Sequence, residues 1–133
     1  MLYKLRHKFR VLLSNVREKK KEKNRSPEWR HIRDEHLKGH PRCEACGSIN
    51  KLQVHHIIPF HTNPLLELDE KNLITLCMDY NECHLEVGHG DSWKCYNPHV
   101  KQDANEYLLS DKFHREFIVE NIKENRIHSS KNE

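Results

Sequence analysis

The hydrophobic pattern predicts two helices in the first third of the chain. Apolar residues in 1–25 recur at three- and four-residue spacing, as on one face of a helix, and basic residues fill the other faces. Ser26 followed by Pro27 is typical of a helix start, with the serine as N-cap and the proline in the first turn. Gly39 is expected to end this second helix.

The middle of the chain predicts two short strands and a short helix. Residues 52–58 alternate loosely and are rich in β-branched side chains, and residues 73–77 are apolar and β-prone. Residues 59–72, between these strands, are polar and include a proline, which suits a loop. The short helix is expected over about residues 82–88, where a glycine ends it.

The C-terminal part is predicted to be helical again. Residues 89–102 show no regular pattern, and a helical stretch follows over about 104–124, with a break near Ser110. Residues 125–133 look like a disordered tail. Short strands among separate helices, in a chain of this length, indicate a single α+β domain.

The composition leaves room for only a thin core. Of the 133 residues, 35% are hydrophobic and 32% are charged, and the mean hydropathy is −0.96. A small polar chain of this kind usually needs a disulfide, a metal or a partner to hold it together. Its apolar runs are far shorter than the roughly 20 residues of a membrane helix. Met1 is not followed by the apolar core of a secretory signal, so we expect neither membrane insertion nor secretion.

The charge is concentrated at the N-terminus. Residues 1–25 hold ten Lys or Arg residues and two Glu residues, a net charge of +8. The remaining residues hold 13 bases and 18 acids, a net charge of −5, which gives the overall +3. A basic arm on a mildly acidic body suggests a polyanionic partner, although a solvated helix face would show the same pattern.

The cysteines predict a structural zinc site. Their number, five, is odd, which argues against a closed set of disulfides. Cys43-x2-Cys46 places two thiolates at the separation that a tetrahedral Zn²⁺ needs, and Cys77-x5-Cys83 supplies a second pair. Such a site would stabilise the thin core. Cys95 is left over as a non-ligand, or it takes the place of Cys83.

Further motifs lie within this cysteine frame. In chain order they are His55-His56-Ile57-Ile58-Pro59, Asn72-Leu73, Leu76-Cys77 and Cys83-His84. Together with the Cys-x2-Cys knuckle, they resemble the HNH endonucleases in their Cys-rich ββα-metal form, over about a third of the chain. The resemblance implies a small ββα-metal core with two structural Cys pairs, flanked by N- and C-terminal helices. It also implies a metal-dependent DNA endonuclease that hydrolyses phosphodiester bonds.

The motif histidines fit this chemistry. Hydrolysis of a phosphodiester needs a base that activates water and a cation that stabilises the leaving oxygen. Neighbours on a strand point to opposite faces, so His55 and His56 can have different tasks. The resemblance implies that His56 is the general base, that His55 is a metal ligand, and that Asn72 holds His56 in the right tautomer. It implies His84, on the short helix, as the second ligand.

The third ligand is less directly indicated. On a regular helix, His89 would lie about 140° round from His84, so the two would not share a face. A helix that ends at Gly88 would let His89 fold back. We therefore predict His89 as the third ligand, with His61 as the weaker alternative.

The cysteine and histidine motifs together predict two different metal sites. The four cysteines would hold a structural Zn²⁺, and the histidines one catalytic divalent cation, Mg²⁺ or Mn²⁺, with Zn²⁺ or Ni²⁺ as alternatives because of the nitrogen ligands. We divide the chain into a basic helical arm (1–25), a nuclease domain (26–124, motif core 43–90) and a tail (125–133).

The expected partner is DNA. The basic residues assigned to phosphate contacts are Lys19, Lys20, Lys21, Lys23 and Arg25. No base-reading module is evident, so we expect nicking with low sequence specificity, and a homodimer or a partner protein for double-strand cutting or targeting. The family resemblance suggests the cytoplasm of a bacterial host, with the gene carried by the bacterium or a virus. The alternative hypothesis is a zinc-knuckle nucleic-acid-binding module without catalysis.

Overall fold

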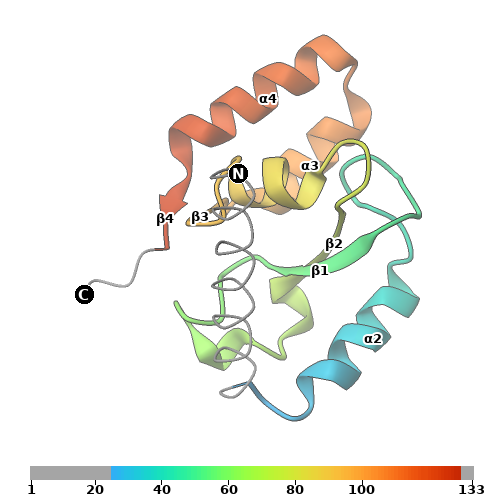
Figure 1. The fold of residues 1–133 in the computed structure, drawn as a ribbon, viewed down its shortest axis with the longest axis vertical. Coiled ribbons are helices and arrows are strands. Elements are labelled where there is room, and N and C mark those ends of the chain that lie inside the picture. The colour runs from blue at the N-terminus through green and yellow to red at the C-terminus, as the bar shows by residue number, and fades with distance from the viewer. Residues whose placement is uncertain (1–24, 130–133) are drawn as a thin grey trace, which may run out of the picture.

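The computed structural model describes residues 25–129 (Figure 1). The predicted helical arm, apart from Arg25, lies outside the described residues, as do its lysines. Helix α2 (Trp29–Gly39) begins two residues later than predicted. The Ser26 carbonyl accepts a hydrogen bond from the Trp29 amide at 3.1 Å, which closes a turn ahead of the helix and makes Glu28 the N-cap. The predicted end of the helix at Gly39 is confirmed.

The centre of the molecule is a two-stranded hairpin. Strands β1 (Leu52–His56) and β2 (Leu73–Cys77) pair antiparallel, with Leu52 opposite Cys77 and His56 opposite Leu73. Every residue of β2 is buried, because this strand is covered on both faces. Strand β1 stops two residues short of the prediction, where the Ile58 amide donates to Asn72 Oδ1 at 2.8 Å instead of continuing the ladder.

The connection between the strands is a folded loop. It contains two single-turn 3₁₀ helices, η1 (Pro64–Leu66) and η2 (Glu70–Asn72). The Asn63 side chain caps the first of these and the Asp69 side chain caps the second, each by accepting a backbone amide. The predicted loop therefore has a defined shape, which places Asn72 directly ahead of β2.

The second half of the chain is mostly helical. Asp111 separates its two long helices and caps the second by accepting the His114 amide at 2.8 Å, so the predicted break near Ser110 is confirmed. The short helix is a π-helix, a rare form whose hydrogen bonds run five residues along the chain. The elements are η3 (His84–Gly88), β3 (Cys95–Tyr96), α3 (Val100–Leu109), α4 (Lys112–Asn125) and β4 (Ile127–His128).

Residues 125–129 differ from the predicted disordered tail. Asn125 ends α4, and β4 pairs antiparallel with β3, with Cys95 opposite His128. The Ser129 amide then donates to the Lys94 carbonyl at 2.7 Å. A two-residue strand is too short to give a periodic signal, so the sequence did not reveal it.

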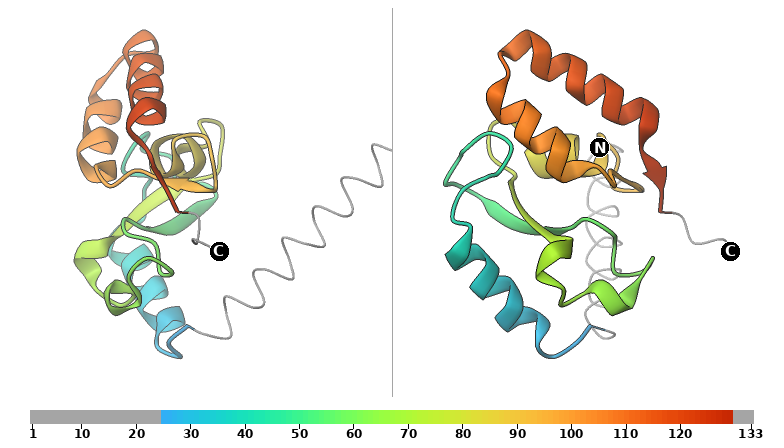
Figure 2. Two further views of the ribbon diagram at one scale, coloured as in Figure 1. Left: turned by 90° about the vertical axis from the view of Figure 1, so that its left-hand side faces the viewer. Right: turned by 180° about the vertical axis from the view of Figure 1, so that it is seen from behind.

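The elements form layers around the hairpin. Figure 1 shows the hairpin between α2 on one side and the pair α3 and α4 on the other, and the view from behind in Figure 2 shows the same order. Helix η3 contacts both strands and also both C-terminal helices, so it joins the hairpin to them. Within residues 25–129, no helix has the length and apolar character to cross a membrane.

The hydrophobic core is small and includes the cysteines. Buried residues from β2, η3, α3 and α4 meet there, among them Leu76, Val87, Val100 and Ile118. The side chains of Trp93 and Phe113 are 55% and 83% exposed and lie outside this core, which consists mainly of smaller aliphatic residues and cysteines.

Candidate metal centres

Four cysteines from two separate parts of the chain come together. Their sulfur atoms all lie within 4.8 Å of one another, and the Cys46 and Cys77 sulfurs are 3.6 Å apart. The first pair lies in a tight turn, in which the Gly47 amide donates to the Cys43 carbonyl and Gly47 has a positive φ of 78°. In the second pair, Cys77 is the last residue of β2 and Cys83 is the residue directly before η3. Cys83 belongs to the cluster, whereas Cys95 lies elsewhere, 3.6 Å from His128 Nδ1.

The acid–base properties of these thiols suit a bound cation. A hydrogen bond from the Cys83 thiol lowers the pKa of Cys43 to about 5. The same bond raises the pKa of Cys83, and burial raises the pKa of Cys77 to about 11. Buried sulfurs this close cannot all ionise without a positive charge among them. Zn²⁺ binds thiolates and would supply that charge, so the donor set fits a closed structural zinc site.

Three histidines form a second cluster beside the hairpin. The ring centroids are 5.0 Å apart for His55 and His84, 4.8 Å for His55 and His89, and 5.1 Å for His84 and His89. The π-helix explains how residues five apart reach one site, because its wider turn brings positions i and i+5 onto one face. On a regular helix, His89 could reach His84 only by folding back after the helix end, so the sequence alone does not predict this arrangement.

Hydrogen bonds orient two of these rings. His84 Nδ1 donates to Gln53 Oε1 at 2.6 Å, and His89 Nδ1 donates to the Cys95 carbonyl at 2.6 Å. These tautomers place the lone pair of each ring on Nε2, as in metal-binding histidines whose other nitrogen is held by an acceptor. His55 Nε2 is buried without a hydrogen-bond partner in the described part of the chain. A cation would satisfy this atom.

Two of the clustered histidines, His55 and His84, have lowered pKa values and stay neutral at neutral pH. Burial lowers the pKa of His84 to about 3, with a further contribution from His89. Burial also lowers the pKa of His55 well below its usual value, and the neighbouring His84 and His89 add to that shift. Neutral imidazoles keep the lone pairs that a metal ion requires, so the cluster fits a divalent cation at neutral pH.

His56 points away from this cluster toward α2. Its ring lies 4.3 Å from the Trp29 ring, and its Nε2 donates to the Glu67 carbonyl at 2.9 Å. The lone pair is therefore on Nδ1. Burial lowers the pKa of His56 to about 4, and the positive charge of Arg25 acts in the same direction. A neutral ring with one fixed nitrogen and one lone pair can accept a proton.

Asn72 does not orient His56 directly, in contrast to the prediction. Within residues 25–129, its side chain bonds to backbone atoms: Oδ1 accepts from the Ile58 amide, and Nδ2 donates to the carbonyls of Ile58 and Leu66. It thereby ties the start of the loop to its end. The backbone of Glu67, in the loop that Asn72 braces, holds the His56 ring.

The three clustered histidines and His56 line the same cavity. A cavity of about 180 Å³ is lined by His55, His56, His84 and His89, together with Arg25 and other residues. His61 also lines it, but it donates from Nε2 to the Ser129 carbonyl at 2.9 Å and lies outside the three-histidine cluster. The predicted separation of His55 and His56 onto opposite faces is thus compatible with a common site.

Several contributors to the site were missed from the sequence. Gln53 had a usable signal, because residues two apart on a strand share a face, and Gln53 stands two before His55. Trp93, an exposed ring, packs 5.2 Å from His84 and 4.8 Å from His89. The carbonyls of Glu67 and Cys95 act through the backbone, which leaves no residue-type signal.

Comparison with known proteins agrees with this geometry. Residues 43–90 match the family model described as HNH endonuclease. Neither a search of curated proteins nor a search of solved structures gave a match. The matched residues include the four clustered cysteines and all three clustered histidines, as well as His56 and Asn72. Residues 43–90 therefore form a domain of the HNH endonuclease family, whose members are phosphodiester hydrolases that act on DNA.

Proposed function

We propose that this protein nicks DNA with low sequence specificity, using His56 as the general base. The observation that carries the proposal is the cavity in which three clustered imidazoles meet a fourth that is held separately. This arrangement suits hydrolysis, in which one group accepts a proton from water while the others hold a cation.

The proposed base acts through its Nδ1. The hydrogen bond from Nε2 to the Glu67 carbonyl fixes the tautomer, and Trp29 packs against the ring and limits its rotation. Water activated by Nδ1 would attack the phosphorus. A DNA phosphate entering the cavity brings negative charge, which raises the pKa of His56 from about 4 and makes it a stronger base in the complex.

His55, His84 and His89 would hold the catalytic cation, which supplies charge stabilisation for the phosphate and the leaving oxygen. The nitrogen donor set favours Mn²⁺, Ni²⁺ or Zn²⁺ over Mg²⁺, which prefers oxygen ligands. The cysteine cluster would hold Zn²⁺ and fix both ends of the hairpin unit, since its members flank β1, β2 and η3.

Arg25 is the described basic residue best placed to contact DNA within the cavity. Its guanidinium packs 5.1 Å from the Trp29 ring and 5.4 Å from the Phe60 ring, and lies 4.0 Å from Glu67. A guanidinium oriented in this way can receive a phosphate beside His56. The lysines at 19, 20, 21 and 23 would add contacts that carry no sequence information.

A nicking assay tests the proposal. Supercoiled plasmid is incubated with the protein and Mg²⁺, Mn²⁺ or Ni²⁺, and the relaxed form is measured. We expect the wild type to nick and His56→Ala to lose about 10²–10⁴-fold in rate while binding DNA equally in a gel shift. His31→Ala, which changes an exposed histidine on α2, is the matched control and should nick like the wild type.

The non-catalytic alternative gives a different result. If wild type and His56→Ala bind DNA equally and neither nicks with any of the metals, the protein is a zinc-knuckle binding module. Equal nicking by both would instead reject His56 as the base.

A further inference from the structure

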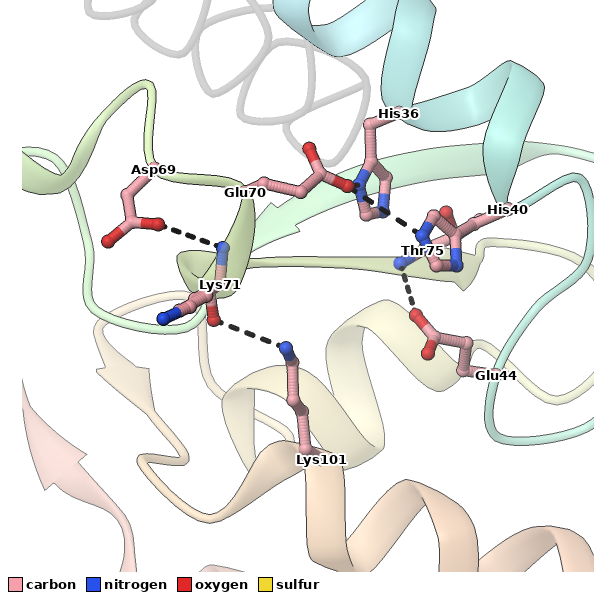
Figure 3. Close-up of polar contacts among 8 residues, drawn as sticks. All are labelled: His36, His40, Glu44, Asp69, Glu70, Lys71, Thr75 and Lys101. Carbon is pink, nitrogen blue, oxygen red and sulfur yellow. Dashed lines mark hydrogen bonds and ion pairs between the residues drawn. The ribbon is translucent and has the colours of Figure 1, made fainter.

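We propose that His36, His40 and Glu70 form a third metal site, for Zn²⁺ or a similar divalent transition metal. The site lies apart from the cysteine cluster and from the three-histidine cluster, between the end of α2 and the loop that precedes β2 (Figure 3). It does not rest on the proposed nuclease mechanism, because none of the three residues lines the cavity that holds His56.

Two turns of backbone bring the donors together. His36 lies in the last turn of α2, and His40, which caps that helix, stands four residues later, where the helix repeat returns to the same face. The two imidazoles stack with centroids 4.4 Å apart. Glu70 is the first residue of η2, whose N-cap Asp69 fixes the turn that directs it toward the helix.

Glu70 contacts His36 directly, and the three donor atoms lie close enough for one ion to reach them all after a small movement of Glu70. Glu70 Oε1 lies 2.5 Å from His36 Nδ1 and 3.7 Å from His40 Nε2. Ligand bonds of about 2.0–2.2 Å around tetrahedral Zn²⁺ separate neighbouring donor atoms by roughly 3.3–3.5 Å. The Glu70 side chain is 59% exposed, so it can move the fraction of an ångström that this spacing requires.

The three donors are of types that bind Zn²⁺. Two imidazoles and one carboxylate are a recurrent Zn²⁺ ligand set, with a fourth position left to water. Only 2% of the His36 side chain is exposed, so a ligand bond at its Nδ1 would be shielded from water.

An ion at this position would link helix α2 to the loop before β2, and both of these segments contact His56. Helix α2 carries Trp29, which packs on the His56 ring, and the loop carries the Glu67 carbonyl that bonds to it. Because Glu70 lies three residues after Glu67, a bond from the ion to Glu70 would tie this loop to α2 and restrict its motion.

Zinc stoichiometry tests the site. Protein whose other sites have been loaded is titrated with ZnCl₂ by calorimetry, and bound zinc is counted after gel filtration. We expect the wild type to bind one equivalent more than His40→Ala or Glu70→Gln, each of which should weaken this binding step by at least about 100-fold. Loss of a direct ligand should exceed the roughly 10–100-fold cost of losing an outer-shell partner.

The variants are chosen so that the result is decisive. His40 and Glu70 are both exposed, so their replacement should leave the fold intact, which circular dichroism checks. His31→Ala, on the same helix, is the matched control and should keep the full zinc count. Zinc should also raise the melting temperature of the wild type and of this control more than that of either variant. Equal zinc counts in all four proteins, or a loss in only one of the two variants, would overturn the three-ligand site.

Discussion

Gln53 offers a sharp test of how the three-histidine cluster is organised. Its Oε1 accepts the hydrogen bond from His84 Nδ1 at 2.6 Å, and this bond sets the tautomer that places the lone pair on Nε2. Gln53→Leu keeps a side chain of similar length but removes the acceptor. The partners of metal-binding histidines are typically worth 10–100-fold in metal affinity. Since Gln53 is exposed, water can partly replace it, so we expect the lower end, about 10-fold or roughly 1.4 kcal/mol.

The assay is the dependence of plasmid nicking on Mn²⁺ concentration. Gln53→Leu should raise the half-saturating Mn²⁺ concentration by about 10-fold and leave the rate at saturating metal nearly unchanged. Gln53→Glu should lower it, because a carboxylate accepts the same hydrogen bond and adds negative charge. Gln102→Leu, an exposed glutamine of α3, is the control. An unchanged half-saturating concentration in Gln53→Leu would show that His84 is not a ligand or does not need this bond.

Three further predictions concern stability. Cys43→Ser should unfold the domain, as seen by circular dichroism, because the free energy of zinc binding is part of the folding free energy; a folded, zinc-free variant would refute this. Burial holds the pKa of His56 at about 4, against about 6.5 in an unfolded chain, so the unfolded state takes up a proton first as the pH falls. The urea midpoint of the wild type should therefore be lower at pH 5 than at pH 7, and this decrease should be smaller in His56→Gln. An equal decrease in both proteins would contradict this. Gly88→Ala would place a Cβ 3.1 Å from Leu76 Cδ1 and 3.3 Å from His55 Cε1, so we expect about 1–3 kcal/mol of destabilisation in urea unfolding, whereas Gly39→Ala, with open space around it, should be neutral.

The parts of the site that could be predicted are those that depend on residue type and spacing. The Cys-x2-Cys turn has few structural solutions, so the pair formed by Cys43 and Cys46 was evident from its spacing alone. The hairpin was evident from two β-prone segments on either side of a polar loop. His55 and His56 could be separated because strand neighbours point to opposite faces.

The parts that could not be predicted depend on backbone geometry. Regular helical periodicity sets His84 and His89 apart, and only the π-helical turn brings them together. The support of His56 by the Glu67 carbonyl carries no sequence signal, and the family resemblance implied Asn72 for that role instead. The grouping of His36 with Glu70 is a long-range contact that sequence spacing does not reveal.

Arg25 and Ser129, the first and last residues described, both line the cavity that holds His56. Segments from opposite ends of the described chain thus form one wall of the same cavity. The shape of this cavity therefore depends on the whole described fold being assembled, and a truncation that removes either residue would take away part of its lining.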